Sequence, residues 1–203
     1  DKYLATSDEK LASGSLTTTG YGVVDVVSGA VAEVKKDVTV AAGTTFDKTG
    51  SGAFTVLGTL KTEAAVKDGA PAGIFNVNGG SVAVNTVANA GTTNVSGSTG
   101  GASGAIFSVT GTGSTNSGDI SLQSGAAFVV KAGADLTNTG AIAGAKDQSG
   151  AYTSVGDVEV AGKLVNGGKG LIQTATLTVE DGGYVSTKIT DAYAVGKTTV
   201  KKG

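Results

Sequence analysis

The chain has 203 residues, among them 34 Gly but no Cys, His, Trp or Met, and its formal net charge at pH 7 is -2. Without Cys and His there is no disulfide, no thiolate or imidazole metal ligand and no His-dependent catalytic triad, so we expect neither an enzyme nor a cofactor. All basic residues are Lys, and no apolar run reaches the length of a membrane helix, so neither nucleic acid binding nor a transmembrane segment is predicted.

The segment 1–20 is predicted to form a polar N-terminal arm or cap, in which Ser7 to Ser13 suit one short helical turn. The next segment, YGVVDVVSGAVAEV (21–34), is rich in β-branched and small residues. We interpret it as a candidate assembly strand that joins the sheet of a neighbouring copy through backbone hydrogen bonds. Its candidate contact residues are Tyr21, Val23, Val24, Val26, Val27, Val31 and Val34.

Nine further short segments carry strand signals and are bounded by Gly, Asn, Asp or Ser. They are residues 37–42, 53–60, 74–77, 81–87, 105–109, 119–122, 126–132, 157–165 and 175–179. The predicted class is all-β, with a single body over residues 21–189 and a C-terminal arm over 190–203. No other segment sustains a helical period.

A Phe-x-Val triplet occurs four times, beginning at positions 54, 75, 107 and 128. Because alternate side chains of a strand share a face, the Phe and Val of each triplet are predicted to point together into a core. If the repeats are in register, they form a core ladder, and the longer middle interval indicates an insertion at Ser96 to Gly104. The ladder residues are Phe54, Val56, Phe75, Val77, Phe107, Val109, Phe128 and Val130.

The spacing of apolar triplets favours a parallel β-helix, or β-solenoid, with polar terminal arms. The triplet centres lie at positions 39, 55, 76, 94, 108, 121, 129, 159 and 178, and several of the gaps between them approach one coil of such a fold. Asn residues near strand edges suit left-handed backbone and stacked ladders. An antiparallel β-sandwich of the jelly-roll type remains the alternative, since the same gaps suit hairpins.

Acidic side chains offer the remaining chemistry. Asp157 and Glu159 lie on one strand face, separated by a single residue, and are the candidate pair for a carbohydrate-cleaving enzyme, followed by Glu180 with Asp181. A solvated strand face and a turn are the simpler interpretations of these two pairs. The metal ligands are left unknown, with Asp47, Asp181 and Asp191 as unranked options for calcium.

Three stretches resemble the coils of right-handed β-helix surface proteins of the autotransporter-passenger and filamentous-haemagglutinin type. They are SGAAFVVKAGADLTNTGAIAG (124–144), GDVEVAGKLVNGGKGLIQ (156–173) and ATLTVEDGGYVS (175–186). In that family, short strands alternate with G-x-L-x-N-x-G-x-I turns. The resemblance implies a secreted or surface-anchored bacterial stalk and carries over no catalytic residue.

Two functions from different classes are therefore expected, and a third is held as a minor alternative. The first is an extracellular structural protein whose partner is itself, forming a homopolymeric filament or surface layer by strand addition or end-to-end stacking. The second is an adhesin stalk that binds host or cell-surface ligands. The third is a carbohydrate-active β-helix enzyme that uses Asp157 and Glu159. The chain begins at Asp1 rather than Met, so we expect either a mature product whose signal peptide has been removed or an excised fragment, and the first alternative fits a secreted protein.

Overall fold

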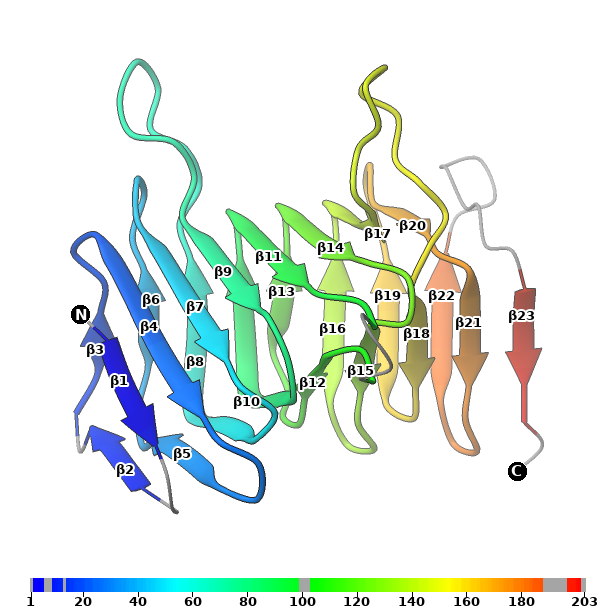
Figure 1. The fold of residues 1–203 in the computed structure, drawn as a ribbon. Coiled ribbons are helices and arrows are strands. Elements are labelled where there is room, and N and C mark those ends of the chain that lie inside the picture. Colours follow the sequence, from blue (N-terminus) through cyan, green and yellow to red (C-terminus); the bar gives the residue numbers. More distant parts are fainter. Residues whose placement is uncertain (1, 6–8, 13, 99–102, 188–196, 202–203) are drawn as a thin grey trace.

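The computed structural model describes residues 2–5, 9–12, 14–98, 103–187 and 197–201, which form a parallel β-solenoid of about seven turns (Figure 1). All pairings between its strands are parallel, and the described residues contain no helix. The predicted all-β solenoid is confirmed. The antiparallel sandwich is excluded, because it would require antiparallel neighbours.

Equivalent strands of successive turns stack into three faces. Face A is an eight-stranded sheet that runs the length of the molecule. Its strands, in spatial order, are β1 (Lys2–Ala5), β4 (Tyr21–Val26), β7 (Thr45–Thr49), β9 (Ile74–Val77), β11 (Thr92–Val95), β14 (Asp119–Leu122), β17 (Ala141–Gly144) and β20 (Leu171–Gln173).

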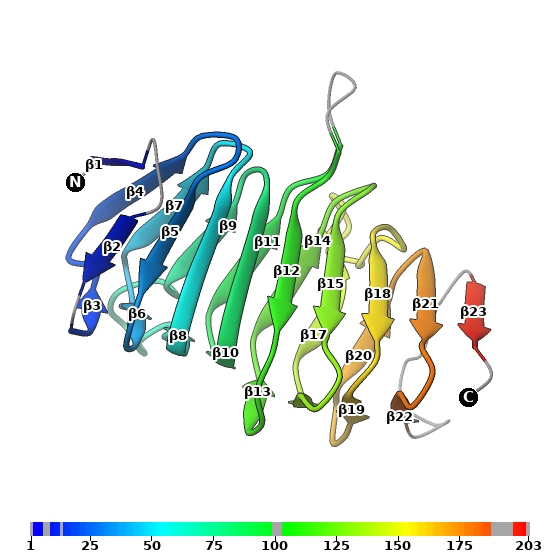
Figure 2. The same cartoon turned by 90° about the horizontal axis from the view of Figure 1, so that it is seen from below.

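Faces B and C belong to one fifteen-stranded sheet, which Figure 2 shows from below. Face B contains β2 (Glu9–Ala12), β5 (Val31–Val34), β12 (Ile106–Val109), β15 (Ala127–Val130), β18 (Asp157–Val160), β21 (Thr176–Val179) and β23 (Lys197–Val200). Face C contains β3 (Leu16–Thr17), β6 (Val38–Val40), β13 (Ser114–Asn116), β16 (Asp135–Asn138), β19 (Lys163–Asn166) and β22 (Tyr184–Thr187).

Two long strands, β8 (Ala53–Thr62) and β10 (Ser81–Asn89), bend from face B into face C and join them. In β8 the bend is at Gly58, where an added Cβ would lie 2.4 Å from Asp37 Oδ1. A side chain there would collide with the corner of the preceding turn. Glycine therefore permits the close approach that keeps the two faces continuous.

Most strands bury alternate residues, as β9, β11 and β18 do, with Phe, Val and Thr side chains inward and mostly polar side chains outward. The length of a turn varies. Phe54, Val82, Phe107, Phe128, Val158 and Leu177 are successive partners on face B. The shortest of these turns runs from position 158 to 177 and the longest from 128 to 158, with the extra length in connections outside the strands.

The described parts of the terminal segments continue the same faces. Strands β1, β2 and β3 pair with β4, β5 and β6, and β23 pairs with β21. Glu9–Ala12 form a strand rather than a helical turn. Residues 1–20 and 190–203, which we expected to be polar arms, therefore contribute rungs to the solenoid where the structure describes them.

Candidate functional site

The eight residues of the predicted core ladder all lie in the interior, each with at most 1% of its surface exposed. They do not form one column. Phe75 and Val77 lie on face A, whereas the other six lie on face B, where Val82 separates Phe54 from Phe107. The interval from Phe75 to Phe107 therefore joins two faces and does not measure a single coil with an insertion.

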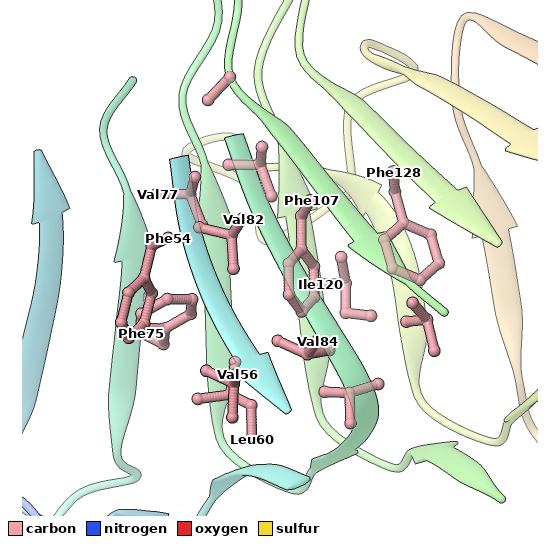
Figure 3. Close-up of a cluster of buried hydrophobic side chains, with 14 of the residues drawn as sticks. Phe54, Val56, Leu60, Phe75, Val77, Val82, Val84, Phe107, Ile120 and Phe128 are labelled. Carbon is pink, nitrogen blue, oxygen red and sulfur yellow. The ribbon is translucent and has the colours of Figure 1, made fainter. Parts of the chain in front are cut away.

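The Phe side chains nevertheless meet across the core, and Figure 3 shows four of them among their apolar neighbours. Phe46, outside the triplet pattern, completes the cluster: its ring centroid lies 5.9 Å from that of Phe54 and 5.8 Å from that of Phe75. The Phe107 and Phe128 centroids are 5.7 Å apart. These rings stabilise the interior and offer no binding surface.

A buried asparagine ladder follows the corner between faces C and A. Asn89, Asn116, Asn138 and Asn166 have at most 4% exposure, and the side-chain amide of each of the first three donates to the Oδ1 of the next at 2.6–2.7 Å. The ladder begins at Thr62 and ends at Thr187. All described positive-φ residues are Gly except Asp68, so these Asn residues stack without adopting the left-handed backbone that we expected.

Lys48 is fully buried in a column of apolar residues, between Val24 and Val77 on face A. Its ammonium donates to the carbonyl oxygens of Gly50, Gly52 and Gly79 at 2.6–2.7 Å. Burial lowers the pKa of the Lys48 ammonium to about 8, and the Asp25 carboxylate opposes this effect. The three carbonyls solvate the charged form, so Lys48 fastens two successive corners together.

Asp47, a calcium option, lies on the outer surface of face A. Its Oδ1 accepts from the Asn76 amide at 2.7 Å, its Oδ2 accepts from the Tyr21 hydroxyl, and Asn94 donates to Asn76 in turn. The hydrogen bond to Asp47 raises the pKa of the Tyr21 phenol. Both Asp47 oxygens are thus engaged within an outer polar ladder.

The other acidic candidates that the structure describes lie on the outer face of β18 and in the turn that follows β21. Asp181 lies in an exposed turn after β21, and Asp191 lies outside the described residues. Asp157 accepts from the Thr176 hydroxyl on the outer surface of face B, and Glu180 forms an ion pair with Lys201 at 2.7 Å. Across the part of the chain that the structure describes, no three acidic side chains are grouped as metal ligands would be.

The connection from β17 to β18 (145–156) forms a small hairpin over face A. An antiparallel bridge joins Lys146 to Tyr152. The Tyr152 hydroxyl donates to Asp119 Oδ1 of β14 at 2.6 Å, and the Gln173 amide of β20 donates to the Tyr152 carbonyl. The Lys146 ammonium lies 4.7 Å from the Tyr152 ring centroid. The hairpin base is therefore fixed to two strands that lie on either side of β17.

The candidate assembly strand at 21–34 is paired on both edges within the chain. Strand β4 pairs with β1 and β7, and β5 pairs with β2 and β8, which occupies both edges of each. Val24, Val26 and Val34 point into the core, whereas Tyr21 and Val27 are exposed and Val23 and Val31 are half-buried. A strand with two partners has no free backbone edge to offer.

Free sheet edges lie at the two ends of the solenoid instead. Among the described strands, β1, β2 and β3 each have one neighbour, as do β20, β22 and β23 at the other end. The inward column Val160, Val179 and Val200 ends with Val200 at 71% exposure. Among the described strands, β23 therefore has one unpaired edge and an exposed valine.

A half-open cavity of about 490 Å³ lies at the N-terminal end, between faces C and A. Leu16 and Thr18 line it from face C, and Gly22, Val24 and Phe46 line it from face A. Gly22 of β4 is paired with Phe46 of β7, and Gly22 has no side chain that could cover the Phe46 ring. The cavity therefore lies beside the Phe46 ring, which is itself only 6% exposed.

Comparison with known protein families, with curated proteins and with solved structures finds no match to this chain. None of the described residues belongs to a helix long and apolar enough to cross a membrane.

Proposed function

We propose that this chain is a secreted structural protein of a bacterial surface, which associates with itself end to end to build a filament or surface layer. The observation that carries the proposal is that, among the described strands, the outermost strand of each face is paired on one edge only at both ends of the solenoid, and Val200 is exposed. Exposed strand edges are templates for pairing with another chain. A solenoid also grows by nearest-neighbour contacts, so an added copy needs only the end surface.

The passenger-like style of the coils supports the surface location. Because the 21–34 segment is paired internally, we propose that strand addition takes place at the terminal strands, where it is the same event as end-to-end stacking. Strand addition and end-to-end stacking, which the sequence offered as two assembly routes, are therefore a single route in this proposal.

Sedimentation and negative-stain electron microscopy over a wide range of protein concentration test this proposal. We expect particles that lengthen along one axis as concentration rises, with the width of a single solenoid. A folded protein that stays monomeric at the highest concentration reached would contradict it.

A second candidate, the adhesin stalk, is favoured by the anchored hairpin at 145–156. Connections that project from a rigid scaffold are common sites of recognition, and the Tyr152 contact with Asp119 fixes the base of this one. Replacing residues 147–150 with a Gly-Ser turn and screening both proteins against glycans and matrix proteins tests it. The adhesin candidate requires a ligand that binds the natural hairpin and not the replacement.

A further inference from the structure

We propose that Asn78 is a site of spontaneous deamidation, and that the isoaspartyl form of this residue loosens the corner held by Lys48. Asn78 and Gly79 directly follow β9, at the corner where the chain passes from face A to the start of β10 on face B (Figure 1). The reaction needs only one copy of the chain, so it does not depend on the proposed assembly.

The chemistry is that of an Asn-Gly sequence. The backbone nitrogen of the glycine attacks the side-chain carbonyl carbon Cγ of the asparagine and loses its proton. The new N–Cγ bond closes a succinimide ring, and the side-chain amide leaves as ammonia. Water then opens the ring at either carbonyl, which gives aspartate or isoaspartate. Glycine favours ring closure because it has no side chain to obstruct the close approach.

The chain contains this sequence twice, at Asn78-Gly79 and at Asn166-Gly167. Asn78 is exposed, and its Oδ1 accepts a hydrogen bond from the Ser96 hydroxyl at 3.0 Å. Among the described residues, neither the Asn78 side-chain amide nor the Gly79 backbone N–H donates a hydrogen bond to a protein acceptor. At Asn78 the attacking nitrogen and the leaving amide are therefore both free to react.

Asn166 is the internal comparison, because it belongs to the buried asparagine ladder and is 4% exposed. Its amide donates to the Gly170 carbonyl at 2.9 Å, and its Oδ1 accepts from the Asn138 amide at 2.7 Å. The Gly167 N–H donates to the Asn138 carbonyl at 2.9 Å. These three bonds must open before the ring can close, so we expect deamidation at Asn166 to be roughly a hundredfold slower than at Asn78.

The product at position 78 affects the corner, because two contacts anchor this corner to the preceding turn. The Asn78 backbone N–H donates to the Lys48 carbonyl at 2.8 Å, and the Gly79 carbonyl accepts from the Lys48 ammonium at 2.7 Å. Aspartate leaves the backbone unchanged, whereas isoaspartate routes the chain through the side chain and adds one methylene between these two contacts. We expect the longer link to displace the Gly79 carbonyl and to leave Lys48 with two of its three acceptors.

Peptide mapping by mass spectrometry, during incubation at mildly alkaline pH, tests the site. In the folded full chain we expect the mass gain of an amide-to-acid conversion at Asn78 and not at Asn166. In the guanidinium-unfolded chain both sites should convert at similar rates, which shows that the assay detects both. Asn78→Gln, whose longer side chain would have to close a larger ring, is the matched control. Equal conversion of the two sites in the folded chain, or an Asn78 that stays intact while the unfolded chain reacts, would overturn the proposal.

Acetylation kinetics measure the effect on Lys48, after electron-transfer fragmentation has identified the isoaspartyl fraction. Lys48 is fully buried and should react slowly with acetic anhydride in fresh protein, whereas Lys61, whose side chain is 52% exposed, should react quickly in every sample. Loss of one acceptor should make Lys48 react roughly tenfold faster in the isoaspartyl protein. Asn78→Asp, which carries the charge without the longer backbone, should behave like fresh protein. Equal Lys48 reactivity in isoaspartyl and fresh protein would overturn the loosening of the corner and leave the deamidation site standing.

Discussion

At the scale of single residues, Lys48 combines a buried charge with a defined hydrogen-bonding role. Its three carbonyl acceptors lie in two successive turns, and Gly80 approaches so closely that an added Cβ would lie 2.6 Å from the ammonium nitrogen. Burial of the charge costs stability, whereas the loss of the ammonium would leave three carbonyls without a donor. Each buried carbonyl left without a donor costs roughly 1–3 kcal/mol. We therefore expect the loss of the ammonium to destabilise the protein at pH 7 by more than the burial of its charge does.

The pH dependence of stability isolates Lys48. Its pKa is about 8 in the folded protein and 10.5 in a free side chain, so between these values the unfolded state binds more protons. The free energy of unfolding therefore rises with pH across this window, by up to about 3 kcal/mol. Guanidinium unfolding of the natural chain and of Lys48→Met at pH 7 and at higher pH measures the difference. Lys48→Met should be less stable than the natural chain at pH 7, and the difference in free energy of unfolding between the two should grow as pH rises. A difference that stays constant with pH would contradict the lowered pKa.

The asparagine ladder leads to a second prediction at this scale. Asn116 donates to Asn138 and to the Ala141 carbonyl, and accepts from Asn89. Asn116→Leu fills a similar volume but leaves these buried partners unsatisfied, so we expect a loss of about 3 kcal/mol in the free energy of unfolding. The adjacent Thr115→Leu, on the exposed side of the same strand, is the control and should change stability by about 0.5 kcal/mol or less. Equal effects of the two variants would mean that the ladder contributes nothing.

At the scale of elements, the hairpin at 145–156 is predicted to open independently of the solenoid. Tyr152→Phe and Asp119→Ala each remove the hydrogen bond that fixes its base. Losing about 1 kcal/mol of local stability should raise the rate of trypsin cleavage after Lys146 by roughly five- to tenfold, without moving the global unfolding transition. Tyr184→Phe, an exposed tyrosine on face C, serves as the control. Unchanged cleavage in both variants would show that other contacts hold the hairpin.

Single strands were predictable from the sequence, but their assignment to faces was not. The short β-branched segments between Gly and Asn indicated the all-β class, and β9, at 74–77, has the predicted bounds. The interval between Phe54 and Phe75 looked like one coil but joins face B to face A. Alternation along a strand shows which side is inward, but it contains no information on which of three faces the strand joins.

The candidate site shows the same division. The inward direction of the Phe and Val residues followed from the period of two, and all of them are buried. The 21–34 segment looked like a free strand, because local pattern does not reveal whether both edges have partners. Lys48 gave no signal, since one Lys in a strand usually faces solvent, and Gly50, Gly52 and Gly79 around it identify the carbonyl cage only when the corners are stacked.

At the scale of the whole molecule, each turn contacts only its neighbours, so stability should depend on position along the axis. Phe107→Ala removes a large side chain from the middle and should destabilise the whole solenoid by about 3–5 kcal/mol. Ile172→Ala, at an equally buried position on β20, should instead release the C-terminal strands in a separate early transition while β10 to β15 stay protected. Hydrogen exchange followed by mass spectrometry at increasing guanidinium concentration resolves the two cases, and Val66→Ala, in an exposed connection, should match the natural chain. If both buried variants unfold in a single transition that covers all three faces, the solenoid behaves as one cooperative unit and the nearest-neighbour account of its stability fails.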